Sequence, residues 1–98
     1  MSGGEISKNT TTNRGGGVFN KGGTFIMSDA AKISENKAMY GGGVYKESGT
    51  FTMSGGTITG NTAAGSAAYA SGGGVYNEAE AFTMSGGTIT QNKSQYNG

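Results

Sequence analysis

The chain consists of one unit that recurs nearly four times. The motif Met-Ser-Gly-Gly-Thr-Ile-Thr begins, intact or with substitutions, at Met1, Met27, Met53 and Met84, so two steps span 26 residues and the last spans 31. Between successive copies lie Gly-Gly-Gly-Val with a following aromatic residue, and then a Phe two residues before the next Met. A repeat of this length is typical of arrays in which each unit forms one layer of a stack. The sequence therefore predicts a solenoid.

Apolar and polar residues alternate with a period of two within each unit. Phe51 and Met53 share one face of an extended segment, while the threonines beside and between them share the other. Such alternation, with β-branched and aromatic residues, predicts strands and not helices. Strands that recur once per turn pair in parallel about 4.8 Å apart, and connections between parallel strands are right-handed. We predict an all-β right-handed parallel β-helix, with three short strands in each coil of about 26 residues and three to four coils.

Equivalent apolar residues of successive coils should form columns that point into the solenoid. Burial of one large apolar side chain contributes about 1.5–3 kcal/mol, so these columns supply the main favourable term in folding. The expected core columns are Ile6, Ile33, Ile58 and Ile89; Val18, Val44 and Val75; Phe25, Phe51 and Phe82; and Met27, Met53 and Met84.

An asparagine closes the Ile strand in every copy. Asn tolerates the left-handed conformation of a sharp corner, and its amide can bond the Asn one coil away. The competing interpretation is N-glycosylation, but only Asn9 and Asn92 lie in Asn-x-Ser/Thr sequences. Because the residue recurs without that sequence in the other two copies, we favour a structural role. The expected corner ladder is Asn9, Asn36, Asn61 and Asn92.

Residues 1–98 form a single β-helix repeat module in this interpretation. The last step is longer because of residues 62–71, which are small, polar and without periodicity, and which predict an insertion loop at one corner. Met1 aligns with the start of later repeats and Gly98 with the first glycine of a triplet, so we interpret the module as a fragment of a larger array. Solenoid ends normally carry polar caps, and we therefore expect self-association through uncapped ends.

The composition argues against several classes of function. The net charge is +1 with scattered basic residues, which does not favour nucleic-acid binding. No segment has the roughly 20 apolar residues of a membrane-spanning helix, so we expect no membrane insertion. The chain has no Cys or His, and Glu78 and Glu80 are the only carboxylates at strand spacing. We therefore expect no catalytic site, no cofactor and no metal site, and keep a fragment of a carbohydrate-active β-helix enzyme as a weak alternative.

Two outward faces could bind a ligand. Phe19, Tyr45 and Tyr76 follow the inward valines and should form an outward stripe, which either contacts a carbohydrate or partner protein or serves only for aromatic stacking between coils. Threonines flank Ile58 and Ile89 in a Thr-x-Thr pattern that is compatible with ordered water or ice. Charged residues replace threonine in the other two copies, so an exposed strand face is the simpler explanation.

The Gly-Gly-Gly-Val and Ile-x-x-Asn motifs resemble the paired Gly-Gly-Ala-Ile and Phe-x-x-Asn repeats of the polymorphic outer-membrane proteins. They are still more similar to the Gly-Gly-Gly-Val-Tyr and Gly-Thr-Phe-Thr-Met-Ser-Gly-Gly-Thr-Ile repeats of large bacterial cell-surface proteins. The resemblance covers essentially the whole chain. It implies an extracellular β-helical passenger or adhesin-like stalk on the bacterial cell surface, with a host protein or a glycan as the kind of partner to expect.

These observations lead us to expect a structural and adhesive repeat module that is not an enzyme. It would act as a stiff spacer or as a contact surface. The alternative is a self-assembling module whose coils stack end to end into a fibre.

Overall fold

The computed structural model describes residues 1–65, 72–79 and 81–94, and in these ranges the chain forms strands and turns but no helix. The strands are β1 (Glu5–Ser7), β2 (Val18–Met27), β3 (Lys32–Ser34), β4 (Lys37–Ala38), β5 (Val44–Met53), β6 (Thr57–Thr59), β7 (Thr62–Ala63), β8 (Val75–Asn77), β9 (Phe82–Met84), β10 (Thr88–Thr90) and β11 (Lys93–Ser94). The all-β prediction is confirmed for this part of the chain.

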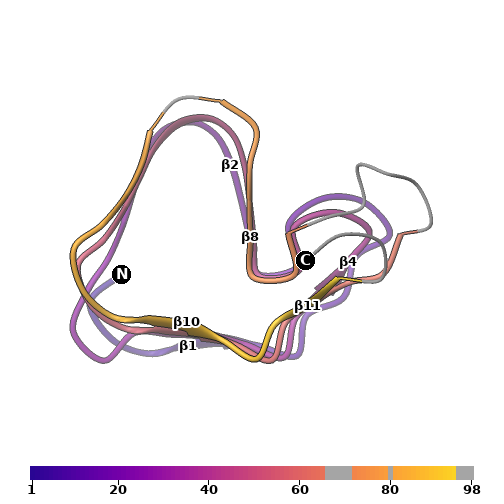
Figure 1. The fold of residues 1–98 in the computed structure, drawn as a ribbon, viewed down its shortest axis with the longest axis horizontal. Coiled ribbons are helices and arrows are strands. Elements are labelled where there is room, and N and C mark those ends of the chain that lie inside the picture. The colour runs from indigo at the N-terminus through magenta and orange to yellow at the C-terminus, as the bar shows by residue number, and fades with distance from the viewer. Residues whose placement is uncertain (66–71, 80, 95–98) are drawn as a thin grey trace.

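The strands stack as a β-solenoid of about three turns. Figure 1 looks along the stack, with the N-terminal coil farthest from the viewer. The chain runs along β1, then up β2 and back over the top, so it turns counterclockwise while it approaches the viewer. This sense of rotation makes the solenoid right-handed, as the rule for parallel connections predicts.

Three parallel sheets form the faces of the solenoid. The first contains β1, β3, β6 and β10, the second β4, β7 and β11, and the third β2, β5, β8 and β9. Equivalent residues pair across each sheet, so that the isoleucines from Ile6 to Ile89 are in register in the first. The repeat seen in the sequence is therefore the stacking period of the structure.

The division into strands differs from the prediction in two ways. The separate Val and Phe strands are continuous in β2 and β5, because bulges near Lys21 absorb the bend between them. Only the third coil splits them, into β8 and β9. The second sheet was not predicted, since its strands have two residues each and show no alternation.

The predicted insertion loop over residues 62–71 is wrong at its start. Its first two residues form β7, and Ala63 is completely buried. The backbone N–H groups of Ala64 and Gly65 donate to carbonyl groups of the preceding coil. These four residues therefore continue the stack, and residues 66–71, like Glu80 and Gly98, lie outside the described residues.

The apolar columns lie inside the solenoid and are best covered in its middle. Side chains with no exposed surface are Met27, Ile33, Val44, Phe51, Met53 and Ile58. The column members in the outer coils pack against this cluster and are half-buried: Ile6, Val18, Phe25, Val75, Phe82 and Ile89. Met84 is in register with the buried Met53 but is 46% exposed. Its strand, β9, pairs on one side only among the described residues, with β5.

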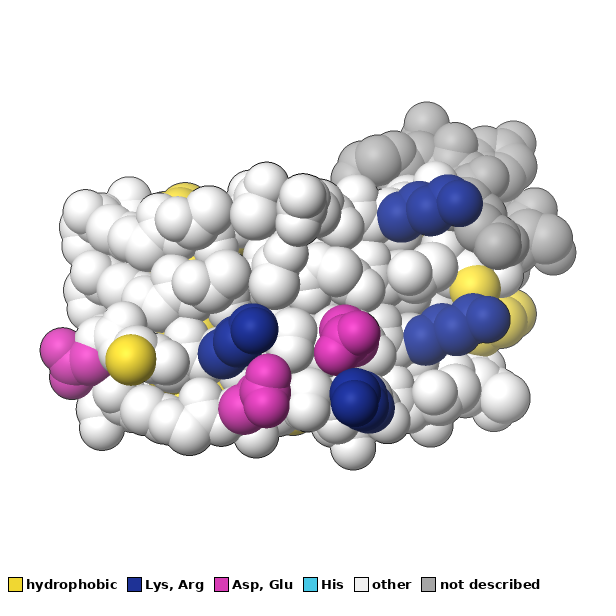
Figure 2. All heavy atoms as spheres, turned by 90° about the horizontal axis from the view of Figure 1, so that it is seen from below, with side chains coloured by type: hydrophobic (Ala, Val, Ile, Leu, Met, Phe, Trp, Pro, Cys, Tyr) yellow, Lys and Arg dark blue, Asp and Glu magenta, His cyan; other side chains and the backbone are white. Residues whose placement is uncertain are grey.

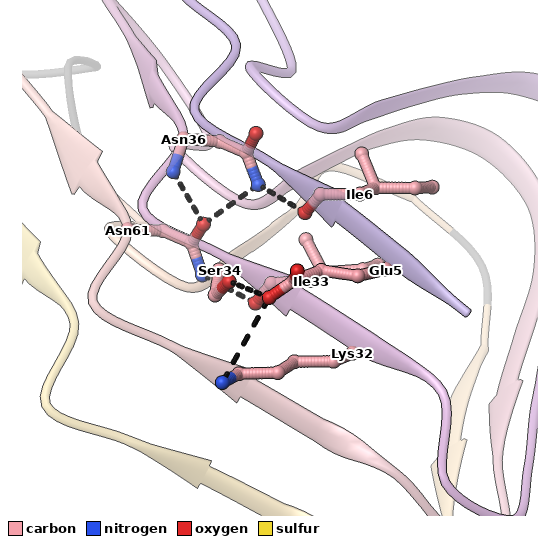
Figure 3. A network of polar contacts seen from close by, with 7 residues as sticks. All are labelled: Glu5, Ile6, Lys32, Ile33, Ser34, Asn36 and Asn61. Carbon is pink, nitrogen blue, oxygen red and sulfur yellow. Dashed lines mark hydrogen bonds and ion pairs between the residues drawn. The ribbon is translucent and has the colours of Figure 1, made fainter. Parts of the chain in front are cut away.

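The four corner asparagines hydrogen-bond from coil to coil. Asn36 Oδ1 accepts from both the backbone N–H and Nδ2 of Asn9, each at 3.0 Å. Asn61 Oδ1 accepts the same pair from Asn36 at 2.9 and 3.0 Å, and Asn92 Oδ1 accepts the pair from Asn61 at 2.9 Å. Each Nδ2 above the first coil also donates to an isoleucine carbonyl, as Figure 3 shows for Asn36 and Ile6.

The hydrogen-bonding capacity of the middle asparagines is fully used. An amide side chain has two N–H donors and two acceptor lone pairs, and Asn36 and Asn61 use all four. They are 1% and 0% exposed, so an unmet donor or acceptor would cost about 1–3 kcal/mol. The predicted backbone conformation is wrong in one respect. The left-handed backbone conformation was expected at the Asn itself, but the residue before it adopts this conformation, as Glu35 does with φ of 55°. The turn at Glu35 directs the side chain of the following Asn inward.

The glycine triplets allow the backbone of one copy of the repeat to lie directly against the next copy. A Cβ atom at Gly42 would lie 2.4 Å from the carbonyl oxygen of Thr62. One at Gly43 would lie 2.5 Å from the oxygen of Gly74 and 3.0 Å from Nδ2 of Asn61. The triplets therefore press against the second sheet and the asparagine ladder, and no larger residue fits without displacement of the backbone.

We expect Gly43→Ala to destabilise the protein by about 1–3 kcal/mol, because the added methyl group overpacks a backbone contact. Gly3→Ala is the matched control, since a Cβ atom there meets nothing within 4 Å. Urea unfolding of both variants measures the difference. Equal midpoints for Gly43→Ala and Gly3→Ala would contradict the close contact.

Candidate functional site

The predicted aromatic stripe exists and its rings stack from coil to coil. Phe19, Tyr45 and Tyr76 are in register on the outer side of β2, β5 and β8. The rings of Tyr45 and Tyr76 are nearly parallel, with centroids 4.8 Å apart and planes at 9°. Phe19 meets Tyr45 edge to face at 5.5 Å. Such pairs contribute about 0.5–1.5 kcal/mol beyond burial, so the stripe joins the coils.

The three rings lie on the outer side of their strands but differ in their exposure to solvent. Phe19 is 43% exposed, but Tyr45 is only 3% exposed. A second wall covers it, made by residues that immediately precede the glycine triplets. The Arg14 guanidinium lies 5.3 Å from the centroid of the Tyr45 ring and 6.0 Å from that of Tyr40. The Tyr40 and Tyr45 rings are 6.5 Å apart.

The two walls line an open pocket of about 360 Å³. Ligand cavities in proteins typically measure about 300–1,000 Å³, so this one has the size of a small binding site. Its lining residues stand on both sides of the glycine triplets, with Arg14 and Tyr40 before a triplet and the other three after one. We call it the aromatic notch and define it by the described residues that line it: Arg14, Tyr40, Tyr45, Tyr76 and Glu78.

Charged groups hold the walls in place. Nη1 of Arg14 forms an ion pair with Oε1 of Glu47 at 3.3 Å. Both side chains are partly exposed, so the pair contributes no more than about 1 kcal/mol, but it fixes the guanidinium over the rings. The hydroxyl of Tyr45 donates a hydrogen bond to the Glu78 carboxylate. The cavity therefore has one cation and one anion among the described residues that line it.

The environment of Tyr45 raises the pKa of its hydroxyl group above the ordinary value. Burial is the largest cause, followed by the hydrogen bond to Glu78 and the negative charge of that residue, while Arg14 acts in the opposite direction. The phenol therefore remains protonated and continues to donate to Glu78 at neutral pH.

Sequence reasoning missed one wall of the notch. It noted Glu78 only for its strand spacing from Glu80 and assigned no role to Arg14 or Tyr40. A signal was present, because Arg14 and Tyr40 each stand directly before a glycine triplet, and they form a parallel bridge in the structure.

Behind the stripe lies a polar column that the sequence reasoning also missed. Asn20, Lys46 and Asn77 pair in register next to the aromatic residues, on the inner side of the strands. Lys46 has no exposed surface, and its ammonium group donates to the carbonyl of Ala79. A buried lysine is rare unless its charge is engaged, so this column tolerates little change.

The threonine face of the first sheet covers only part of that sheet. Thr57 and Thr59 pair with Thr88 and Thr90 on β6 and β10. On the adjacent strands an ion pair of 3.8 Å joins Lys32 to Glu5. Figure 2 shows charged side chains gathered over the lower half of this face, on the side of β1 and β3. The regular threonine surface thus spans two coils and then ends.

Comparison with protein-family models, curated proteins and solved structures gives no match for this chain. In the part of the chain that the structure describes, no helix is long and apolar enough to cross a membrane. The same residues contain no group of three or more His, Cys, Asp or Glu side chains that could hold a metal ion. The aromatic notch is therefore the candidate site that the geometry offers.

Tyr45 makes the stability depend on pH in the alkaline range. Its pKa is raised in the folded state, so its contribution is complete below about pH 10 and falls as the unfolded phenol ionises above that value. We expect the wild type to lose about 1 kcal/mol more than Tyr45→Phe between about pH 9 and pH 11. Urea unfolding at both pH values measures this, and identical losses in the two proteins would contradict the assignment.

Proposed function

We propose that this chain is a non-enzymatic structural and adhesive repeat module of a bacterial surface protein. It acts as a stiff spacer and presents a contact surface. The observation that carries the proposal is the asparagine ladder, which runs through all four copies of the corner and is buried at Asn36 and Asn61. Bending a solenoid pulls its coils apart on one side. Hydrogen bonds that run along the stacking axis oppose this separation and so make the solenoid stiff.

The acidic residues support a structural role. Three of the five glutamates hold parts of the solenoid together. Glu5 pairs with Lys32 and accepts from Ser34, Glu47 pairs with Arg14, and Glu78 accepts from Tyr45. A general acid or base must instead point at a substrate with a shifted pKa.

The absence of cysteine fits this role outside the cell. Small extracellular domains usually gain rigidity from disulfides. This sequence has no cysteine, and parallel pairing from coil to coil together with the ladder supplies the rigidity in their place. Placement on a bacterial surface rests on the resemblance of the repeats to those of large surface proteins.

The stiffness of the backbone tests the spacer proposal. We expect order parameters of about 0.85 for the strands of all three sheets from ¹⁵N relaxation of the purified chain. Asn61→Ala should lower them around its corner, because it leaves Asn36 without its acceptor. Order parameters below about 0.6 throughout one sheet of the wild type would contradict a stiff module.

The two alternative functions have their own readouts on the same sample. Release of new sugar ends from a panel of polysaccharides would favour the carbohydrate-active enzyme and overturn the non-enzymatic proposal. Growth of long polymers with concentration in sedimentation velocity would favour the fibre. We expect neither.

A further inference from the structure

We propose that the aromatic notch binds one neutral sugar ring of a glycan. This inference rests on the proposed function, because it names the ligand class of the contact surface. The cavity of about 360 Å³ lies at the small end of the range for ligand sites, which suits roughly one or two sugar rings and not a folded partner.

The stacked tyrosines provide the apolar platform that a sugar requires. One face of a pyranose ring carries C–H groups that pack on the face of an aromatic ring. The Tyr76 ring lies flat against Tyr45 on one side, lines the cavity and remains half-buried, and Tyr40 stands on the opposite wall. Because stacking already fixes the Tyr76 ring, binding need not order it, which lowers the entropic cost.

The charged groups of the notch match the hydroxyl groups of a sugar. A guanidinium offers five N–H donors in a plane, and a carboxylate offers two acceptor oxygens, so each can bond two adjacent hydroxyl groups. Arg14 is held over the tyrosine rings by Glu47, and Glu78 is held by the hydroxyl of Tyr45. Both groups are therefore preorganised beside the platform.

The charge of the lining favours a neutral ligand. Arg14 and Glu78 cancel each other among the described residues that line the cavity. A quaternary ammonium group would suit a cage of tyrosines, but the Arg14 guanidinium already lies over Tyr40 and Tyr45. A sugar acid would meet the carboxylate of Glu78. A neutral polyhydroxyl compound avoids both repulsions.

The test is a titration of the ¹⁵N-labelled chain with methyl glycosides of glucose, galactose, mannose and N-acetylglucosamine, followed by NMR. At least one should give saturable shifts at Tyr76 and Glu78 with a Kd of about 1–10 mM. Tyr76→Ala and Arg14→Gln should each weaken binding about tenfold, because they remove the platform and the donor plane. Phe19→Ala is the matched control, since Phe19 belongs to the same column but lies outside the lining, and it should bind like the wild type.

The same titration is repeated with tetramethylammonium, as a quaternary ammonium ion, and with glucuronate, as a sugar acid. Binding of either without a neutral glycoside would overturn the proposal, as would the absence of shifts at about 50 mM of every neutral glycoside. The proposal would also be overturned if the folded Arg14→Gln variant bound the glycoside as tightly as the wild type does. That variant alters a side chain that is 40% exposed, so it should fold even if Tyr76→Ala does not. If no neutral glycoside binds but the backbone order parameters are high, the sugar-site proposal is wrong and the spacer proposal still holds.

Discussion

The side-chain amides of Asn36 and Asn61 are buried, and their hydrogen bonds run parallel to the backbone pairing, from one coil to the next. Every donor and acceptor of these amides has a partner, so a shift of one residue between coils would leave several of them unmet inside the protein. The ladder thereby sets the register of the apolar columns. It does so at the corner where the Ile strand ends, next to the second sheet.

The glycine triplets extend this constraint to the candidate site. Because the middle and last glycines carry no side chain, the backbone before β5 can lie against the second sheet and the ladder. The chain then doubles back within a few residues. This brings Arg14 and Tyr40, which precede a triplet, opposite Tyr45 and Tyr76, which follow one. The aromatic notch is thus a geometric consequence of the same close contact that tightens the core.

The parts of this fold that could be predicted are those that recur in every copy. The spacing of Met27 and Met53 shows the stacking period, and alternation shows which side of a strand is buried. What could not be predicted depends on contacts between unlike parts of neighbouring coils, or on strands too short to show a pattern. The burial of Tyr45 requires that Arg14 fold over it, and a strand as short as β7 has no pattern of its own. Glu35 occupies the left-handed position because the ladder needs the Asn side chain turned inward, which residue preference alone does not reveal.

The ladder is the central claim of this account, and hydrogen exchange of the asparagine side chains tests it most directly. The side-chain NH₂ protons of Asn36 and Asn61 should exchange as slowly as the backbone amides of the surrounding strands, because opening them requires the coils to separate. Asn13 is exposed and serves as the internal reference for fast exchange. Exchange of Asn36 and Asn61 at the rate of Asn13 in the folded protein would contradict the account.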